Sequence, residues 1–160
     1  MIMETGKLAI DQSLFMMAFG RDVDYHDLAP QLIYLDRHTG DVMWLYESDE
    51  DAFLEVGLSA AENRGQRERI AAEPNRYLEI PGLDHDDHHQ ILKRFLRSDW
   101  TDDANRSSKA FEAYSGSIGG WKKSVNDEGA IHAFYEYQET RITELAEEFL
   151  AENGIVPNWK

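Results

Sequence analysis

The strongest pattern in this sequence lies near its C-terminus, where apolar residues recur at helical spacing. On a helical wheel they fall within about 100° of one another, and they are Ile131, Phe134, Tyr135, Gln138, Ile142, Leu145 and Phe149. The opposite side carries acids, namely Glu136, Glu144, Glu147 and Glu148. Asn153-Gly154 supplies a left-handed cap, and Pro157 prevents the helix from continuing. The pattern predicts a long helix with one apolar and one acidic face.

Two β-rich runs in the first half of the chain predict a hairpin. Leu-Ile-Tyr-Leu at residues 32–35 and Val-Met-Trp-Leu-Tyr at residues 42–46 are separated by a polar segment. Gly40 in that segment can adopt the positive φ that a hairpin turn needs. A third strand is predicted at residues 76–80, closed by Pro81.

The composition of the flanking segments indicates how they are organised. The apolar spacing of residues 8–19 predicts a short buried helix, and residues 22–30 form a polar connection. After the hairpin, an acidic patch over residues 47–55 leads into a polar stretch over residues 59–75. We interpret that stretch as a mobile insertion or linker and expect any helical piece within it around residues 66–72.

From residue 83 onward the pattern is helical. Leu83-Asp84 marks a helix entrance, and the apolar face that follows consists of Ile91, Leu92, Phe95 and Leu96. We therefore predict an α+β fold, in which a small antiparallel sheet (hairpin plus third strand) is followed by a helical C-terminal half. Residues 1–82 form the N-terminal part with the hairpin and the mobile insertion. Residues 83–160 form the helical part, packed with the first as one compact domain.

The charge of the chain excludes several classes of function. Its 160 residues hold 16 lysines and arginines against 31 aspartates and glutamates, a formal net charge of −15. Neutralising phosphates requires clustered cations, so we expect no direct binding of duplex nucleic acid and no attachment to anionic membranes. Cysteine is absent, which excludes disulfides and thiolate chemistry. The start of the chain lacks a long apolar run, so we expect a cytoplasmic protein, and no cofactor motif is recognised.

A cluster of histidines and aspartates, Asp84-His85-Asp86-Asp87-His88-His89, offers the ligands of a metal site. The candidate ligands are Asp84, Asp87, His88 and His89, and with them the chain would be a metal-assisted hydrolase. The alternative is that the acids cap the first turn of a helix and that the histidines are solvated. No HExxH pattern is present, and no other catalytic set is recognised. Asp99, Asp102 and Asp103 around Trp100 are interpreted as helix ends rather than as a catalytic dyad.

The distribution of acids favours binding over catalysis. Residues 127–152 hold eight acids against the single base Arg141, a local net charge of −7. The candidate contacts to a basic protein are Glu136, Glu144, Glu147 and Glu148, and solubility is the alternative reason for so many acids. The leading hypothesis is a non-enzymatic interaction or regulatory protein, in its narrower form a nucleic-acid mimic or inhibitor.

A small basic spot stands out in this acidic chain. Trp121, Lys122 and Lys123 place an aromatic residue beside two bases, as a candidate contact to a partner, a small anion or an RNA end. We expect the Trp121 ring to lie in the core and the two lysines to be exposed. Gly-Ser-Ile-Gly-Gly before it lacks the spacing of a phosphate-binding loop. Trp159 and the aromatic residues of the helices make a homodimer a further alternative.

The order of several short motifs resembles a bacterial family of uncharacterised proteins, number 0158 of the UPF series. The matching motifs are Tyr34-Leu35-Asp36 with Thr39-Gly40, Arg76 through Pro81, Phe134-Tyr135-Glu136-Tyr137 with Arg141, and Glu152-Asn153-Gly154-Ile155. The family usually carries a Gly-Ala-Phe-Arg-Arg-Phe-Lys-like run before the last helix. Here the corresponding residues read Ser117-Ile118-Gly119-Gly120-Trp121-Lys122-Lys123, without the Gly-Ala-Phe opening. The resemblance implies a related fold and a small bacterial cytoplasmic protein, and it implies no activity.

Overall fold

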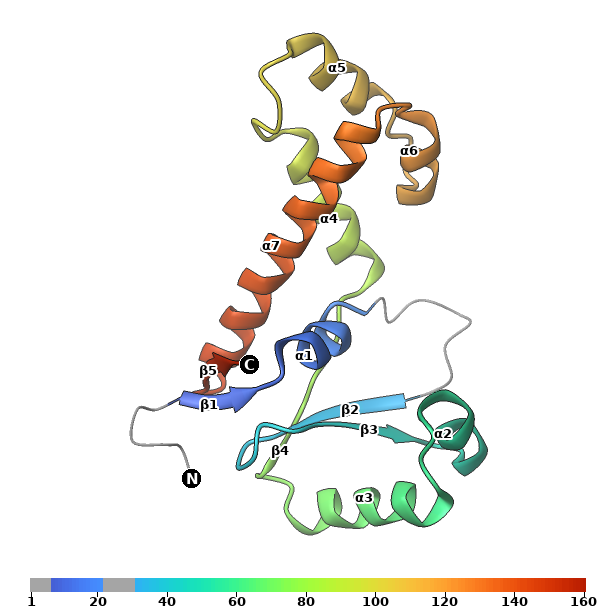
Figure 1. The fold of residues 1–160 in the computed structure, drawn as a ribbon, viewed down its shortest axis with the longest axis vertical. Coiled ribbons are helices and arrows are strands. Elements are labelled where there is room, and N and C mark those ends of the chain that lie inside the picture. Colours follow the sequence, from blue (N-terminus) through green and yellow to red (C-terminus); the bar gives the residue numbers. More distant parts are fainter. Residues whose placement is uncertain (1–6, 22–30) are drawn as a thin grey trace. The chain divides into compact units, whose positions relative to one another are not determined.

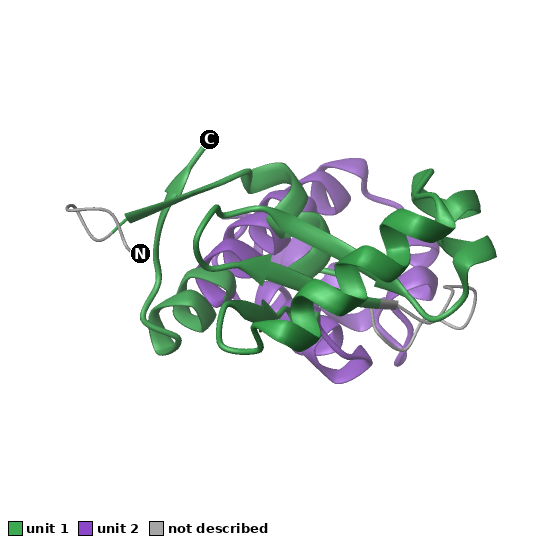
Figure 2. Ribbon diagram, turned by 90° about the horizontal axis from the view of Figure 1, so that it is seen from below, with its two compact units in different colours: residues 1–82, 146–160 green, residues 83–145 purple. Residues whose placement is uncertain are grey.

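The computed structural model describes residues 7–21 and 31–160 (Figure 1). The polar connection predicted at residues 22–30 lies outside this part of the chain. The described residues form two compact units, which Figure 2 distinguishes by colour. Unit 1 comprises Met1–Gly82 together with Ala146–Lys160, and unit 2 comprises Leu83–Leu145. The fold is α+β, as predicted, with the antiparallel sheet in the N-terminal half and helices dominating the C-terminal half.

The sheet of unit 1 confirms the predicted hairpin and third strand. Strands β2 (Gln31–Asp36) and β3 (Val42–Tyr46) are antiparallel, and β4 (Tyr77–Glu79) pairs antiparallel with the other edge of β2. Gly40 in the turn has a φ of 80°, and a Cβ there would lie 1.8 Å from the carbonyl oxygen of Ala9. Only glycine fits this position, because it combines a positive φ with a close approach of another backbone segment.

The two ends of the described chain form a second, parallel pair of strands that the sequence did not predict. Strand β1 (Lys7–Ile10) pairs with β5 (Val156–Trp159). The predicted helix over residues 8–19 is therefore wrong over its first part, and helix α1 spans only Gln12–Phe19. The side chain of Asp11 accepts a hydrogen bond from the Leu14 N–H and begins the helix there. Because β5 pairs with β1, the chain from Ala146 onward belongs to unit 1 rather than to the helical unit.

Two helices separate the hairpin from β4. Helix α2 spans Asp49–Val56, and α3 spans Ala60–Ala72. Helix α3 includes the helical piece expected around residues 66–72 and continues through most of the stretch that was interpreted as a mobile insertion. Helix α3 is polar and largely exposed, but the side chain of Asn63 is fully buried. The Asn63 side chain accepts a hydrogen bond from the Tyr46 N–H (3.1 Å) and donates to the Tyr46 carbonyl (2.9 Å) and to Asp49 (3.0 Å). Gln66 and Arg67 of the same helix also donate to carbonyls of β3, those of Trp44 and Tyr46, at 2.9 Å each. These polar contacts attach α3 to the end of β3, and an apolar pattern in the sequence does not predict them.

Unit 2 consists of helices around an aromatic core. Its elements are α4 (His85–Leu96), α5 (Ala104–Glu112), α6 (Ile118–Ser124) and the first part of α7, which spans Glu128–Glu152. Phe95, Trp121 and Phe134 are each fully buried, and the Trp121 and Phe134 ring centroids lie 5.4 Å apart. Tyr135 was predicted on the apolar face of α7 but is 46% exposed. None of the helices in residues 7–21 and 31–160 is long and apolar enough to cross a membrane.

Candidate functional site

The Asp/His segment forms the N-terminus of helix α4, and two of its aspartates cap that helix. The Asp84 carboxylate accepts a hydrogen bond from the Asp87 N–H (2.8 Å), and the Asp87 carboxylate accepts one from the Asp84 N–H (3.1 Å). This reciprocal pair is a capping box, and it satisfies two of the amides that a helix N-terminus leaves free. The acids therefore have the local structural role that the sequence offered as the alternative to metal binding.

The histidines of this segment differ in burial, because His85 is exposed, His88 is half-buried and His89 is buried. His89 is only 8% exposed, and its Nδ1 makes a short contact with the Tyr114 hydroxyl. Burial lowers the pKa of His89, and the neighbouring His85 and Lys93 lower it further. Within the described residues, no group of three or more His, Asp or Glu side chains is placed to hold a metal ion. Asp84, Asp87, His88 and His89 are thus not brought together as a metal site.

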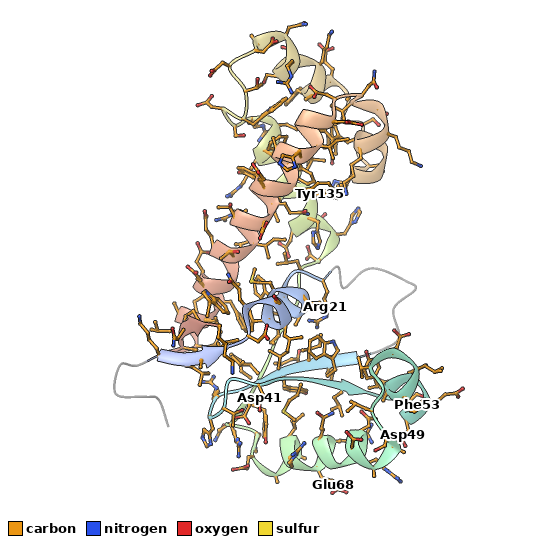
Figure 3. The ribbon with its side chains drawn as sticks, in the orientation of Figure 1. Arg21, Asp41, Asp49, Phe53, Glu68 and Tyr135 are labelled. Carbon is orange, nitrogen blue, oxygen red and sulfur yellow. The ribbon has the colours of Figure 1, made fainter. Side chains whose placement is uncertain are left out.

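The predicted basic spot is divided between core and surface. Trp121 is fully buried, and its indole N–H donates to the Ala110 carbonyl at 2.9 Å. The expectation that this ring lies in the core is therefore confirmed, and the ring is not available to a partner. The local pattern did not show that α5, α6 and α7 surround this side chain. Lys122 places its Nζ 4.8 Å from the ring centroid of Tyr135, which is labelled in Figure 3. Lys123 is exposed. Only the two lysines can meet a ligand, and one of them already covers an aromatic ring.

The acids of α7 are exposed, as the helical wheel predicts, but their surroundings differ. Glu136 lies 3.2 Å from His132 Nε2, and Glu144 accepts a hydrogen bond from Arg141 at 3.1 Å, both within unit 2. In unit 1, Glu147 accepts a hydrogen bond from the Trp159 indole at 3.3 Å, and Glu148 is exposed. Exposed pairs of this kind contribute little to stability. The acidic face of α7 therefore keeps most of its charge available to solvent or to a partner.

Unit 2 contains an open cleft between the end of α4 and the first part of α7, which we call the α4–α7 cleft. Its volume is about 430 Å³, and its lining includes Phe95, Asp99, Trp100, Glu136, Tyr137 and Thr140. The buried Phe95 ring supports both other rings, with centroid distances of 5.3 Å to Trp100 and 5.6 Å to Tyr137. The carboxylates of Asp99 and Glu136 thus lie beside the rings of Trp100 and Tyr137, which we call the aromatic wall. None of the described lining residues is a lysine or an arginine.

An arginine behind this wall shows how the unit accommodates a cation. The guanidinium of Arg106 lies 5.2 Å from the Trp100 ring centroid and donates two hydrogen bonds, each of 3.0 Å, to the Asp127 carboxylate. This pairing lowers the pKa of Asp127, chiefly through the hydrogen bonds from Arg106. Asp103, in contrast, caps α5 by accepting from the N–H groups of Asn105 and Arg106. The interpretation as a helix end is therefore right for Asp103, whereas Asp99 lines the cleft.

Helix α2 in unit 1 exposes large apolar side chains. Phe53 is 65% exposed, Leu54 70% and Val56 46%, and Ala52 is the buried residue of the helix (Figure 3). The same helix carries the acids Asp49, Glu50, Asp51 and Glu55. No lysine or arginine occurs in the sequence between Arg37 and Arg64. We call the exposed side chains of Asp49–Val56 the α2 surface. Contiguous exposed apolar residues of this kind mark interaction sites more often than scattered ones do.

Neither surface was predicted as a site. The acidic patch at residues 47–55 was visible in the sequence, but whether Phe53 and Leu54 face the core or the solvent was not. The cleft combines residues more than thirty positions apart, so no local motif could reveal it. The neighbouring Asp99-Trp100 pair was its one local signal. Comparison of the chain with protein-family models, curated proteins and solved structures finds no match. The resemblance to family 0158 of the UPF series therefore stays a prediction.

Proposed function

We propose that this protein is a non-enzymatic interaction or regulatory protein that binds a basic protein partner through acidic surfaces. The observation that carries the proposal is the α2 surface, where Phe53, Leu54 and Val56 are 46–70% exposed on a helix with four acids. Apolar contacts supply most of the affinity of a protein interface, and the surrounding charges select and steer the partner. A partner with basic residues around an apolar groove fits this combination.

The acidic face of α7 supports the same proposal. Its exposed carboxylates raise the rate at which a basic partner associates, and this effect falls as salt increases. The narrower proposal of a nucleic-acid mimic or inhibitor requires that the partner itself binds nucleic acid at the same surface. From the family resemblance we further infer a bacterial, cytoplasmic protein. No observation in the described residues favours the metal-assisted hydrolase, because its four ligands are not assembled.

The test is affinity capture from host lysate with nuclease added, using the parent chain and two matched surface variants. Phe53→Ser with Leu54→Ser removes the apolar part of the α2 surface. Phe111→Ser, on α5, removes an apolar side chain that is 53% exposed elsewhere. All three side chains are exposed, so we expect changes in stability within about 0.5 kcal/mol. A basic protein that the parent and Phe111→Ser retain, and that the α2 variant loses, supports the proposal. Equal retention by all three would contradict it.

A second pair of variants separates the acidic face of α7 from net charge alone. Glu144→Lys with Glu148→Lys reverses two exposed acids of the acidic face of α7, and Glu68→Lys with Glu112→Lys makes the same charge change on α3 and α5. The first pair should weaken capture at about 50 mM salt and have little effect at about 500 mM, because screening removes the charge contribution. Equal weakening by both pairs would show that net charge, not the α7 face, attracts the partner. Competition of the captured protein with DNA tests the mimic.

Self-association is tested in the same preparations. Trp159, which suggested a homodimer, packs against Phe15 with a centroid distance of 5.7 Å and donates to Glu147, both within unit 1. It is therefore partly used inside one chain. A dimer in light scattering that the α2 variant abolishes would assign the α2 surface to a second copy instead of a basic partner.

A further inference from the structure

The α4–α7 cleft has the size of a binding site for one side chain. Its volume of about 430 Å³ lies at the lower end of the range for small-molecule sites. The lining comes from the last turn of α4 with the residues that follow it, and from the adjoining face of α7. All of these residues belong to unit 2, so the cleft is formed within one compact unit. A large cofactor would not fit, whereas a charged side chain would.

The polar groups of the cleft offer negative charge and hydrogen-bond acceptors. Asp99 and Glu136 are exposed carboxylates that come from two different elements. The Ser98 hydroxyl donates to the Phe95 carbonyl at 2.6 Å, which leaves its oxygen to accept from a ligand. The nearest basic residues along the chain are Arg97, which is exposed and lies two positions before Asp99, and His132, whose Nε2 lies 3.2 Å from Glu136. Neither of them lines the cleft. Such a lining repels anions and favours a cationic group that donates several hydrogen bonds.

The aromatic wall favours a planar cation. Tyr137 and Trp100 both rest on the fully buried Phe95, so their rings are held in place. The Trp100 ring already carries the Arg106 guanidinium at 5.2 Å, with Asp127 as the carboxylate partner. Unit 2 thus contains one arginine held between an aromatic ring and a carboxylate. The cleft repeats these components with Tyr137 as the ring and Asp99 and Glu136 as the carboxylates.

We propose that the α4–α7 cleft binds the guanidinium of an arginine side chain presented by the basic partner. This inference rests on the proposed function for the source of the arginine. Arginine is favoured over lysine because its guanidinium is planar, stacks on aromatic rings, is weakly hydrated and donates in a fork to carboxylates. Because the cleft is open to water, a single arginine binds weakly, and the site acts as one contact within a larger interface.

The test is a titration of the full chain, followed by proton–nitrogen correlation spectra. The probe is N-acetyl-arginine amide, with N-acetyl-citrulline amide as the neutral analogue of the same shape and N-acetyl-lysine amide as the other cation. We expect saturable shifts at the Tyr137 amide and the Trp100 indole with the arginine probe, with a Kd in the range of about 1–10 mM. Citrulline should give no saturable shift, and lysine should bind more weakly.

Two charge-matched variants place the binding in the cleft. Asp99→Asn with Glu136→Gln removes its two carboxylates, and Asp102→Asn with Glu139→Gln removes two exposed acids outside it. We expect the first pair to weaken binding of the arginine probe about tenfold and the second to leave it unchanged. All four side chains are exposed, so unchanged spectra without probe show that each variant is folded. The proposal would be overturned if the arginine probe caused no shifts, or if the citrulline probe caused equal shifts. It would also be overturned if the lysine probe bound equally or more tightly, or if both variants lost binding equally.

The two proposals fail in different ways. The titration needs no partner. Saturable arginine binding without any captured protein would therefore support the arginine site in the cleft and contradict the proposal of a basic partner. If the cleft variant captures the partner as well as the parent chain does, and no arginine binding is detected, the cleft is not a contact. The proposed function would then rest on the α2 surface alone.

Discussion

Replacing Asp36 by asparagine tests how the hairpin is held to the third strand. The Asp36 side chain is only 6% exposed and accepts hydrogen bonds from Arg76 Nε (3.0 Å) and Arg76 Nη2 (2.9 Å). The same carboxylate accepts the N–H groups of His38 (2.8 Å) and Thr39 (3.3 Å) in the hairpin turn. One charge therefore connects the end of β2, the turn and the residue that precedes β4.

The size and the pH dependence of the effect follow from the pKa. Burial alone would raise the pKa of Asp36, but the hydrogen bonds from Arg76, His38 and Thr39 outweigh it and lower the pKa from 3.8 to about 2. The folded state thus binds this proton less tightly than the unfolded state. The ionised carboxylate stabilises the fold above about pH 4, and this contribution is lost as the pH falls towards about 2. The difference between the two pKa values corresponds to roughly 2.5 kcal/mol of unfolding free energy. Because Arg76 is partly exposed, screening by water reduces this contribution to about 1–2 kcal/mol.

The measurement is urea unfolding of the parent chain and Asp36→Asn at several pH values, with hydrogen exchange to follow β2 and β4 separately from unit 2. We expect a loss of about 1–2 kcal/mol at neutral pH that shrinks towards zero near pH 2. Asp41→Asn, an exposed acid of the same turn (Figure 3), is the control and should change stability by less than about 0.5 kcal/mol. A loss that stays constant with pH, or no loss at neutral pH, would show that the Asp36 charge does not hold the hairpin to β4.

Three further substitutions test other parts of the structure. Asn63→Ala removes the buried attachment of α3 and leaves the Tyr46 N–H without its side-chain partner, while the bonds of Gln66 and Arg67 to β3 remain. We expect a loss of about 2–3 kcal/mol in the free energy of unfolding and faster hydrogen exchange in α3, with Arg64→Ala as control. Gly40→Ala forces a Cβ to within 1.8 Å of the Ala9 carbonyl oxygen at a φ of 80°; thermal unfolding should show a loss of about 3 kcal/mol or more. Asp84→Ala breaks the capping box and should lower the free energy of unfolding by about 1 kcal/mol. Added zinc should leave the melting temperature of the parent chain unchanged, and a zinc-dependent rise would support the metal site that the sequence suggested.

Local pattern determined much of the fold. The hairpin and the third strand follow from β-rich runs between turn residues, and α4 begins at Asp84, where an acid precedes an apolar face. The long helix α7 ends as predicted, because Gly154 adopts a φ of 73° and the Ile155 N–H donates to the Leu150 carbonyl at 2.8 Å. These features depend on residues a few positions apart, and their physical causes are therefore visible in the sequence.

The candidate sites depended on the tertiary structure for the opposite reason. Which side chain is buried is decided by segments far away in the chain, so Trp121 beside two lysines lies in the core, whereas Phe53 and Leu54 beside acids lie on the surface. Strand β1 exists because β5, at the other end of the chain, supplies its hydrogen-bond partners. Asp99 and Glu136 meet in one cleft only because α4 and α7 pack around Phe95. The acidic charge and the local elements are thus properties of the sequence alone. Which acids and rings lie together depends on how distant segments pack, because burial and proximity are properties of the whole fold.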